Sequence, residues 1–359
     1  MRWFEHVQRR EGDGAARRRT TALSFLRSAR SFEVCCYMKN RSFNKWVKVE
    51  EGESERKPRA RTKSTFGQSH DPLLRTTQTG FILWRLHRKG RMKFLELFGR
   101  LKSVVIGMIH VKALPGSPLG SLKMSEISEA ACREAAIYRD AGVDGLIVEN
   151  MHDVPYSLSA GPEVSACMTA ICCSVRAACP SLPIGAQILT AANQQALAVA
   201  LASGLDFIRA EAFVFAHVAD EGLLNAGAGE LLRYRKQIGA EHVQIFTDIK
   251  KKHSSHALTS DVSVAETARA AEFFLSDGVI ITGAATGLQA DPEELRDVSQ
   301  SVGIPVLIGS GVTYDNVESY LDANAMIVGS HFKLGGHWAN EVDPQQVKRF
   351  MGKIRKLRQ

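Results

Sequence analysis

Residues 305–333, with the sequence PVLIGSGVTYDNVESYLDANAMIVGSHFK, contain two short apolar runs that each lead into a glycine-containing loop. The first loop is Gly309-Ser310-Gly311, and the second is Gly329-Ser330, with Lys333 three residues further on. Glycine lets backbone N–H groups come close to an anion, and a helix start after the loop adds partial positive charge. A single glycine after a strand is commonly only a turn residue. Two such loops at successive strand ends instead predict the seventh and eighth βα loops of a (β/α)8 barrel, which together bind a phosphate.

Upstream of this stretch, short apolar runs alternate with longer helical patterns, as in consecutive βα units of an α/β protein. The expected strands are Ser103–Ile109, Gly145–Glu149, Pro183–Ile188, Asp206–Ala210, Val243–Thr247, Gly278–Ile281, Pro305–Ile308 and Ala325–Val328. The expected helices between them are Ser125–Ala141, Gly161–Ala178, Asn193–Ser203, Gly229–Ile238, Val262–Ser276 and Pro292–Val302. No expected strand stands out as an edge, which favours a closed TIM barrel over a doubly wound open sheet.

Residues 1–91 differ from the rest of the chain in charge. They hold 22 Lys/Arg against 9 Asp/Glu, a net charge of +13, whereas residues 92–359 hold 24 against 29, a net charge of −5. This excess and the lack of periodicity predict a disordered basic extension before a barrel domain over residues 92–359. Residues 15–30 have the Arg-rich, acid-free composition of a mitochondrial transit segment, although acidic residues flank them. A usual start at Met92 is the alternative, so the expected location is cytoplasmic or mitochondrial.

The composition also bears on partners and cofactors. The mildly acidic barrel region argues against a nucleic-acid partner. No run approaches the ~18 apolar residues of a membrane-spanning helix, so no transmembrane segment is expected. None of the seven cysteines forms a C-x-x-C pair, which favours buried thiols over metal ligands. The sequence requires no cofactor, and it is compatible with a homo-oligomer.

Polar side chains follow the apolar runs at the strand ends, where a barrel of this type has its active site. The candidate acid/base catalysts are His110, Glu149, Glu211 and Asp248. The candidate substrate-binding residues are Asn150, Gln187, Arg209, Lys252, His253, Gly309, Ser310, Gly311, Gly329, Ser330 and Lys333. An imidazole titrates near neutrality, and carboxylates from separate strands suit either proton abstraction beside a carbonyl or the binding of a divalent cation.

Several of these residues also have a purely structural interpretation. Arg209 and Glu211 point to the same side of a strand, so they are expected to pair with each other in a core salt bridge or with a ligand. His110 fits a hydrogen-bonded core position as well as a catalytic one. The basic run 250–253 is a solvated surface unless one member meets a phosphate. Two long loops, residues 111–124 and 212–228, are expected to act as lids or as packed surface loops.

Several short motifs together resemble one known family. They are Gly107-Met108-Ile109-His110, Leu114-Pro115-Gly116-Ser117-Pro118, Val148-Glu149-Asn150, Gly161-Pro162-Glu163-Val164-Ser165-Ala166 with Met168-Thr169, Asp206-Phe207-Ile208-Arg209-Ala210-Glu211, Asp248 with Lys252-His253, Gly309-Ser310-Gly311-Val312, and Val328-Gly329-Ser330 with Lys333. From about residue 92 to its end, the chain is similar to the BtpA/SgcQ family. The resemblance implies a TIM barrel of the ribulose-phosphate-binding type. A cyanobacterial member is known for photosystem I biogenesis or stability, and a bacterial relative is encoded among sugar-metabolism genes. The family brings no settled catalytic residues.

The leading expectation is an enzyme with isomerase-, lyase- or hydrolase-type chemistry on a small phosphorylated metabolite, such as a sugar phosphate or a nucleotide-like compound. The two glycine loops would hold the phosphate, and Arg209 and Lys252 would stabilise developing negative charge. One alternative is a non-catalytic assembly or stability factor. Another is a metal-dependent hydrolase that uses His110, Glu149, Asp248 and His253.

Overall fold

The computed structural model describes residues 90–283 and 285–359. The predicted basic extension, residues 1–91, lies outside this part of the chain except for its last two residues. Residues 90–98 are helical, so a helix of the folded region includes those two residues.

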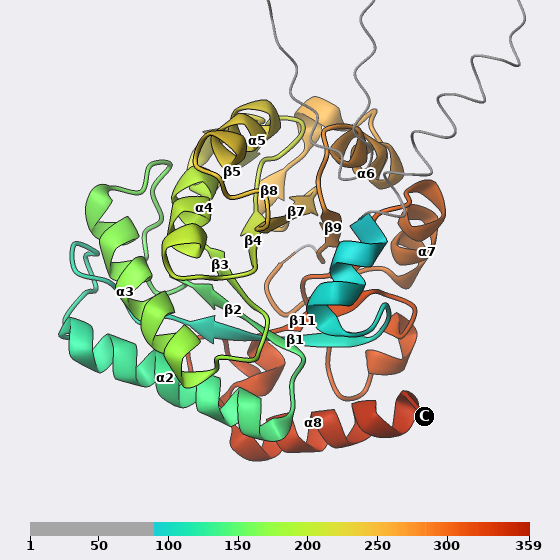
Figure 1. The fold of residues 1–359 in the computed structure, drawn as a ribbon. Helices are drawn as coiled ribbons and strands as arrows, with labels where there is room; N and C mark the ends of the chain where they lie inside the picture. Colours follow the sequence, from blue (N-terminus) through green and yellow to red (C-terminus); the bar gives the residue numbers. More distant parts are fainter. Residues whose placement is uncertain (1–89, 284) are drawn as a thin grey trace, which may run out of the picture. The chain divides into compact units, whose positions relative to one another are not determined.

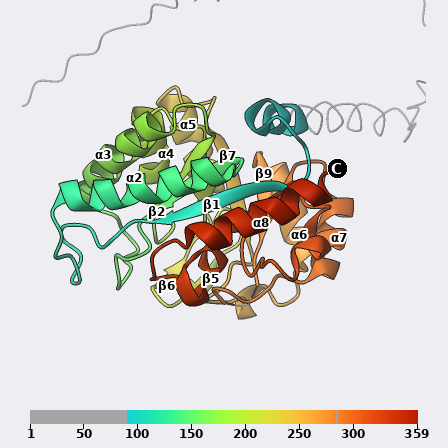
Figure 2. The same ribbon diagram turned by 90° about the horizontal axis from the view of Figure 1, so that it is seen from below.

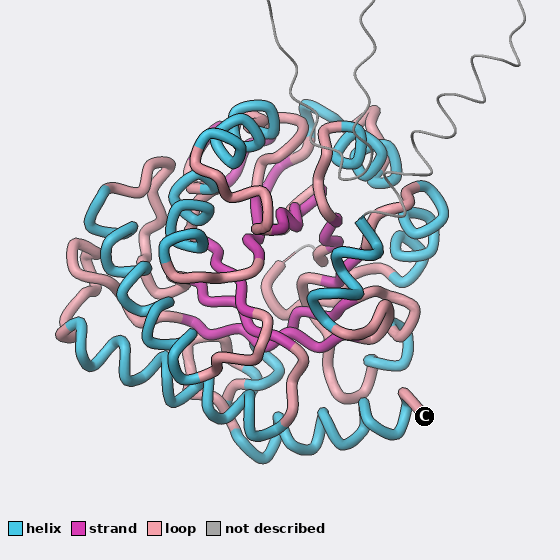
Figure 3. Tube along the Cα trace, viewed as in Figure 1, coloured by secondary structure: helices cyan, strands magenta, loops and turns pink. Residues whose placement is uncertain are grey.

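Eight parallel strands form a closed barrel (Figures 1 and 3). They are β1 (Val104–His110), β2 (Gly145–Glu149), β3 (Ile184–Gln187), β4 (Phe207–Ala210), β7 (Gln244–Ile249), β9 (Gly278–Ile281), β10 (Val306–Ile308) and β11 (Ala325–Val328). Their order around the barrel follows the chain, and β1 pairs with both β2 and β11, which closes the sheet. The predicted barrel and its eight strands are confirmed, and the open doubly wound alternative is wrong.

Helices cover the outside of the barrel (Figure 2). They are α2 (Met124–Ala141), α3 (Pro162–Ala178), α4 (Asn193–Ala202), α5 (Ala228–Gln237), α6 (Val264–Phe273), α7 (Pro292–Ser301) and α8 (Pro344–Leu357). A 3-10 turn, η2 (Val317–Tyr320), takes the place of a helix between β10 and β11. The helix α8 was not among the expected ones, and it packs beside α2 (Figure 2). Within the described residues, no helix is both long and apolar enough to cross a membrane.

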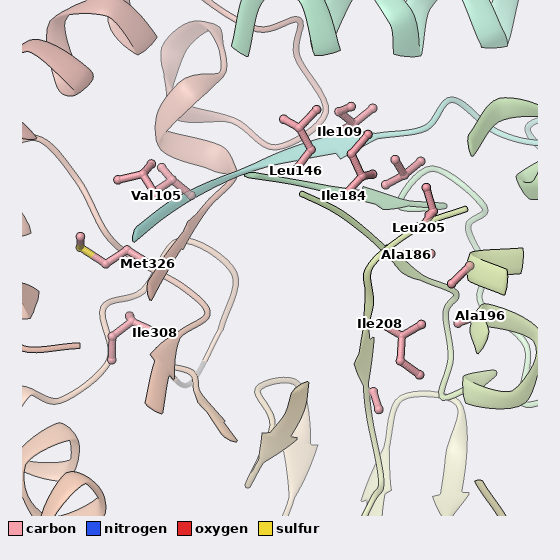
Figure 4. Close-up of a cluster of buried hydrophobic side chains, with 14 of the residues drawn as sticks. Val105, Ile109, Leu146, Ile184, Ala186, Ala196, Leu205, Ile208, Ile308 and Met326 are labelled. Atoms are coloured by element: carbon pink, nitrogen blue, oxygen red, sulfur yellow. The ribbon is translucent and has the colours of Figure 1, made fainter. Parts of the chain in front are cut away.

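The strand side chains alternate between two apolar layers, one outside and one inside the barrel. On β1, Val105 and Ile109 belong to the outer layer, which packs between the strands and the helices (Figure 4). Ile106 and Met108 on the same strand belong to the inner layer. Both layers are buried, which explains why the strands read as nearly continuous apolar runs.

Aromatic rings fill the inner layer at the amino end of the barrel. Phe94 and Phe98, from the helix over residues 90–98, pack against Phe246 and Phe207, with ring centroids 6.0 and 5.9 Å apart. Phe207 and Phe246 lie at 5.3 Å from each other. In the part of the chain that the structure describes, this cluster fills the amino end of the barrel interior.

One hydrogen-bonding pattern recurs around the amino end of the barrel. The first residue before alternate strands is an Asp or Asn whose side chain accepts a backbone N–H from the start of the preceding strand. The pairs are Asp144 with Val105, Asp206 with Ile184, Asp277 with Ile245, and Asn324 with Val306. An arginine side chain also binds each of the three aspartates. The Asp or Asn before each of these four strands is therefore a shared way of joining neighbouring βα units.

Asp206 allows a test of this pattern. Asp206→Ala is expected to lower the free energy of unfolding by about 1–3 kcal/mol, because it leaves the Ile184 N–H without its acceptor. Asp206→Asn should cost less than about 1 kcal/mol, since asparagine keeps the acceptor, as Asn324 does, and loses only the ion pair with Arg176. Urea denaturation followed by circular dichroism measures both values. Equal losses in the two variants would contradict the role assigned to the backbone hydrogen bond.

Candidate functional site

The carboxyl end of the barrel surrounds a cavity of about 450 Å³. Its wall comes from the ends of the strands and from the loops that follow them. Most of the residues predicted for the site lie in this wall: His110, Glu149, Gln187, Arg209, Glu211, Lys252, His253, Gly309, Ser310, Gly311, Gly329 and Ser330. Asn150, Asp248 and Lys333 do not line it.

His110 and Glu149 lie side by side in the cavity wall. His110 Nε2 is 3.8 Å from Glu149 Oε2, and both residues are almost fully buried. His110 Nδ1 lies 2.8 Å from the carbonyl oxygen of Trp338. A carbonyl can only accept, so Nδ1 carries the proton and Nε2 presents its lone pair to the cavity. This contact fixes the tautomer of His110.

Burial sets the protonation of this pair. It lowers the pKa of His110 to about 3, with the positive charge of Lys333 as a further cause, so the imidazole is neutral at neutral pH. Burial raises the pKa of the Glu149 carboxyl, although the charges of Arg209 and Lys252 oppose the shift. A neutral imidazole beside a carboxyl with a raised pKa is suited to acid/base chemistry in which the carboxyl gains and loses the proton.

Arg209 and Asp248 form a buried ion pair with two hydrogen bonds. Arg209 Nε lies 3.0 Å from Asp248 Oδ1, and Nη2 lies 2.9 Å from Oδ2. The side chains are 4% and 1% exposed, so water cannot replace either partner. Burial alone would lower the pKa of Arg209, but Asp248 keeps it raised and the guanidinium charged. Asp248 thus serves to position Arg209, which faces the cavity.

Glu211 pairs with a cation from the next loop. Glu211 Oε1 lies 3.5 Å from Lys251 Nζ, and Oε2 accepts the backbone N–H of Ala191 at 3.0 Å. Of the two expected alternatives, a salt bridge between Arg209 and Glu211 is therefore wrong, and contact with a ligand stays a prediction. Neighbouring strands are closer together (about 4.8 Å) than alternate residues along one strand (about 6.6 Å), which favours a partner on the adjacent strand.

Lys252 and His253 follow β7 and both reach the cavity. Lys252 forms no ion pair with any residue that the structure describes. Burial and the nearby charge of Arg209 lower the pKa of its ammonium. His253 is more exposed, and its Nε2 accepts the backbone N–H of Thr286 at 3.1 Å. Lys252 is therefore the cation of this wall that is available to an anion, while His253 holds the loop around residue 286.

The two glycine loops follow β10 and β11, as predicted, and both line the cavity. Within residues 90–283 and 285–359, the backbone N–H groups of Ser310, Gly311 and Ser330 have no acceptor. The hydroxyl of Ser310 is engaged elsewhere, because it accepts the Gly283 N–H at 2.6 Å. The loops therefore have three backbone donors that are available to a ligand in the cavity.

Two of these glycines are required for different reasons. Gly311 has a φ of +71°, and a Cβ there would lie 2.2 Å from Gln289 Cα, so this glycine is needed for the loop itself. Gly329 has a φ of −111° and a ψ of −88°, and its Cβ would lie 3.3 Å from His110 Nε2. Its missing side chain therefore leaves space inside the cavity beside His110.

Lys333 does not serve the anion contact that the sequence suggested. Its Nζ donates to both carboxylate oxygens of Glu134 on α2 at 2.8 Å, and its side chain is 1% exposed. The 3-10 turn η3 (Ser330–Phe332) rotates the chain, so the lysine points toward α2. Asn150 is likewise structural, because its side chain accepts the Leu189 N–H at 2.8 Å and donates to Asp153 at 3.0 Å.

Several loop residues in the wall were not predicted. Trp338, Tyr156, Thr190, Glu221 and Lys251 all line the cavity. Glu221 lies in the predicted lid loop, which forms strands β5 (His217–Ala219) and β6 (Gly222–Leu224) and pairs with β8 (Ser254–Ser255). The lengths of the loops predicted that they could act as lids over the site, but the sequence did not show which of their side chains face the cavity.

The residues proposed for a metal-dependent hydrolase do not come together. Asp248 is bound to Arg209, and His253 to Thr286, which leaves only His110 and Glu149 adjacent. In the part of the chain that the structure describes, no group of three His, Cys, Asp or Glu side chains is placed to hold a metal ion.

Comparisons with known proteins find relatives that match this chain over most of their own length. The BtpA family model matches residues 101–356. An uncharacterised mitochondrial protein of Caenorhabditis elegans is 49% identical over 273 residues, which are 75% of this chain and 99% of that protein. The photosystem I biogenesis protein BtpA of Synechocystis is 34% identical over 250 residues, covering 69% of this chain and 86% of that protein. Phosphoribosyl anthranilate isomerase from Thermus thermophilus is 12% identical with a TM-score of 0.44, and the match covers 71% of this chain and 99% of that one. The chain belongs to the BtpA family.

Proposed function

We propose that this protein is an enzyme that moves a proton on a small phosphorylated metabolite. The observation that carries the proposal is the His110–Glu149 pair, 3.8 Å apart in a deep cavity that also receives Arg209 and Lys252. Two cations and a carboxyl with a raised pKa suit the removal of a proton next to a carbonyl, because the cations stabilise the enolate that forms.

In this proposal each residue has a distinct role. Glu149 takes the proton from carbon and later returns it. The lone pair of His110 Nε2 accepts a hydrogen bond from a substrate hydroxyl and orients it. Arg209, held by Asp248, and Lys252 face the oxygen on which negative charge develops. The backbone N–H groups of Ser310, Gly311 and Ser330 bind the phosphate.

Gly329→Ala tests the phosphate site. The added methyl group would enter the cavity beside His110, so we expect affinity for inorganic phosphate to fall about tenfold or more. Isothermal titration calorimetry measures the affinity. Gly227→Ala is the matched control, because a Cβ at Gly227 meets nothing within 4 Å. Failure of wild-type protein to bind phosphate, or unchanged binding by Gly329→Ala, would refute the phosphate site. Gly311→Ala is unsuitable, since its Cβ clashes with the loop backbone.

The non-catalytic alternative makes a different prediction. An assembly factor would depend on its surface rather than on Glu149, so a cell phenotype fully rescued by Glu149→Gln would favour that alternative. Of the two expected locations, cytoplasmic and mitochondrial, the name of the C. elegans relative supports the mitochondrial one.

A further inference from the structure

We propose that the cavity binds an amino group of its ligand on the side opposite the phosphate, so that the metabolite is an amino-bearing phosphate ester. The inference rests on the proposed function and names the substrate class for the same site. It is carried by unpaired acceptors and negative charge around Gln187, Glu221 and Tyr156, which all line the cavity.

Two buried oxygen atoms in this region lack a donor. Gln187 Oε1 and Glu221 Oε2 have no hydrogen-bond partner within the described residues, and Gln187 is only 2% exposed. Leaving a buried acceptor unpaired is costly, and such groups are rare in folded proteins. A ligand that presents hydrogen-bond donors here would satisfy both atoms.

The surrounding contacts fix the orientation of both side chains. Gln187 Nε2 lies 3.5 Å from Glu211 Oε1. A carboxylate only accepts hydrogen bonds, so the amide of Gln187 directs its nitrogen toward Glu211 and its oxygen away from it. Thr190 Oγ1 donates to Glu221 Oε1 at 2.8 Å, which leaves Oε2 for a ligand. The region thus holds two unpaired acceptors in side chains of residues that line the cavity.

The charge of this region favours an ammonium over a neutral hydroxyl. Glu221 forms no ion pair with a described residue, in contrast to Glu211 with its Lys251. Burial raises the pKa of Tyr156, and the next causes are the negative charges of Glu149, Glu221, Glu211 and Asp153, so four carboxylates act on this phenol. A protonated amine would supply both the donors and the missing positive charge.

The barrel separates this region from the phosphate loops. Gln187 ends β3, which lies four strands from β10 in the closed order, directly across the barrel. Gly309 and Gly311 follow β10. A ligand that spans the cavity therefore has its anion at the glycine loops and its amine at Gln187 and Glu221.

Two matched pairs of compounds test the inference by calorimetry at pH 7. The pairs are glucosamine 6-phosphate with glucose 6-phosphate, and 2-aminoethyl phosphate with 2-hydroxyethyl phosphate. In at least one pair, the amino compound should bind about tenfold more tightly or better. Glu221→Gln should abolish this preference, whereas Gly329→Ala should weaken both members of a pair alike. The exposed Asp261→Asn serves as a charge-matched control that keeps the preference.

The outcomes separate the two proposals. Equal affinity within both pairs, or a preference that survives Glu221→Gln, would overturn the amine site while phosphate binding still supports the proposed function. If neither inorganic phosphate nor any of the four compounds binds, the proposed function fails, and the amine site fails with it.

Discussion

Asp248→Ala is expected to lower the free energy of unfolding by about 3–5 kcal/mol, because it leaves the buried Arg209 guanidinium without its carboxylate. The two side chains share two hydrogen bonds and are 4% and 1% exposed. Urea denaturation measures the loss. Asp322→Ala is the control, since its ion pair with Lys102 is solvent-exposed, at 87% and 63%, and should contribute less than about 1 kcal/mol.

The double variant Arg209→Met/Asp248→Leu sharpens this test. Replacing both charges by apolar side chains removes the uncompensated cation, so this variant should recover much of the stability that Asp248→Ala loses. A single variant within about 1 kcal/mol of wild type would mean that the pair does not fix Arg209. Because Asp248→Ala is expected to destabilise the fold, a loss of activity in this variant would not report on catalysis alone. Glu149 is therefore the better residue for testing catalysis.

Glu149→Gln is expected to reduce proton exchange by about 10² to 10⁴-fold, because glutamine keeps the shape of the side chain but cannot take a proton. The measurement follows the loss of carbon-bound hydrogen beside the carbonyl of phosphorylated ketoses and aldoses in D₂O by proton NMR. Glu129→Gln is the control, since this side chain on α2 is 71% exposed. No enzyme-dependent exchange in any compound, or equal exchange by Glu149→Gln, would contradict the role of Glu149.

The rate of proton exchange by the wild-type protein should also fall at both acidic and alkaline pH. Burial raises the pKa of Glu149 above its ordinary 4.5, and the base must be ionised, so the rate should fall as pH drops through that raised value. Burial lowers the pKa of Lys252 below 10.5, so its positive charge is lost, and the rate falls, before that pH is reached on the alkaline side. A profile without an acidic limb above 4.5 would exclude Glu149 as the base.

The strands of this fold were predictable because both of their faces are buried. Val104–His110 and the other barrel strands carry apolar residues on both faces. Their sequences are therefore nearly continuous apolar runs, which differ from the periodic pattern of the helices between them. Because the apolar runs marked where each strand ends, the polar residues His110, Glu149 and Arg209 could be assigned to the strand ends, where the site lies. The strand ends and the loops that follow them therefore predicted 12 of the 29 residues that line the cavity.

Pairings and loop paths were not predictable in the same way. The strand pattern showed that Arg209 faces inward, but its partner Asp248 comes from a neighbouring strand brought close only by the closed sheet. A single 3-10 turn precedes Lys333, whose side chain pairs with Glu134 and does not line the cavity. Trp338, whose carbonyl fixes the tautomer of His110, lies in a loop without periodicity. These features depend on tertiary geometry that local sequence does not encode.

A crystal structure of the protein soaked in inorganic phosphate tests the central claim most directly. We predict a phosphate in the cavity, with oxygen atoms within hydrogen-bond distance of the backbone N–H groups of Ser310, Gly311 and Ser330. A cavity without bound phosphate at concentrations that saturate the protein in solution, or phosphate bound only outside the barrel mouth, would contradict the claim.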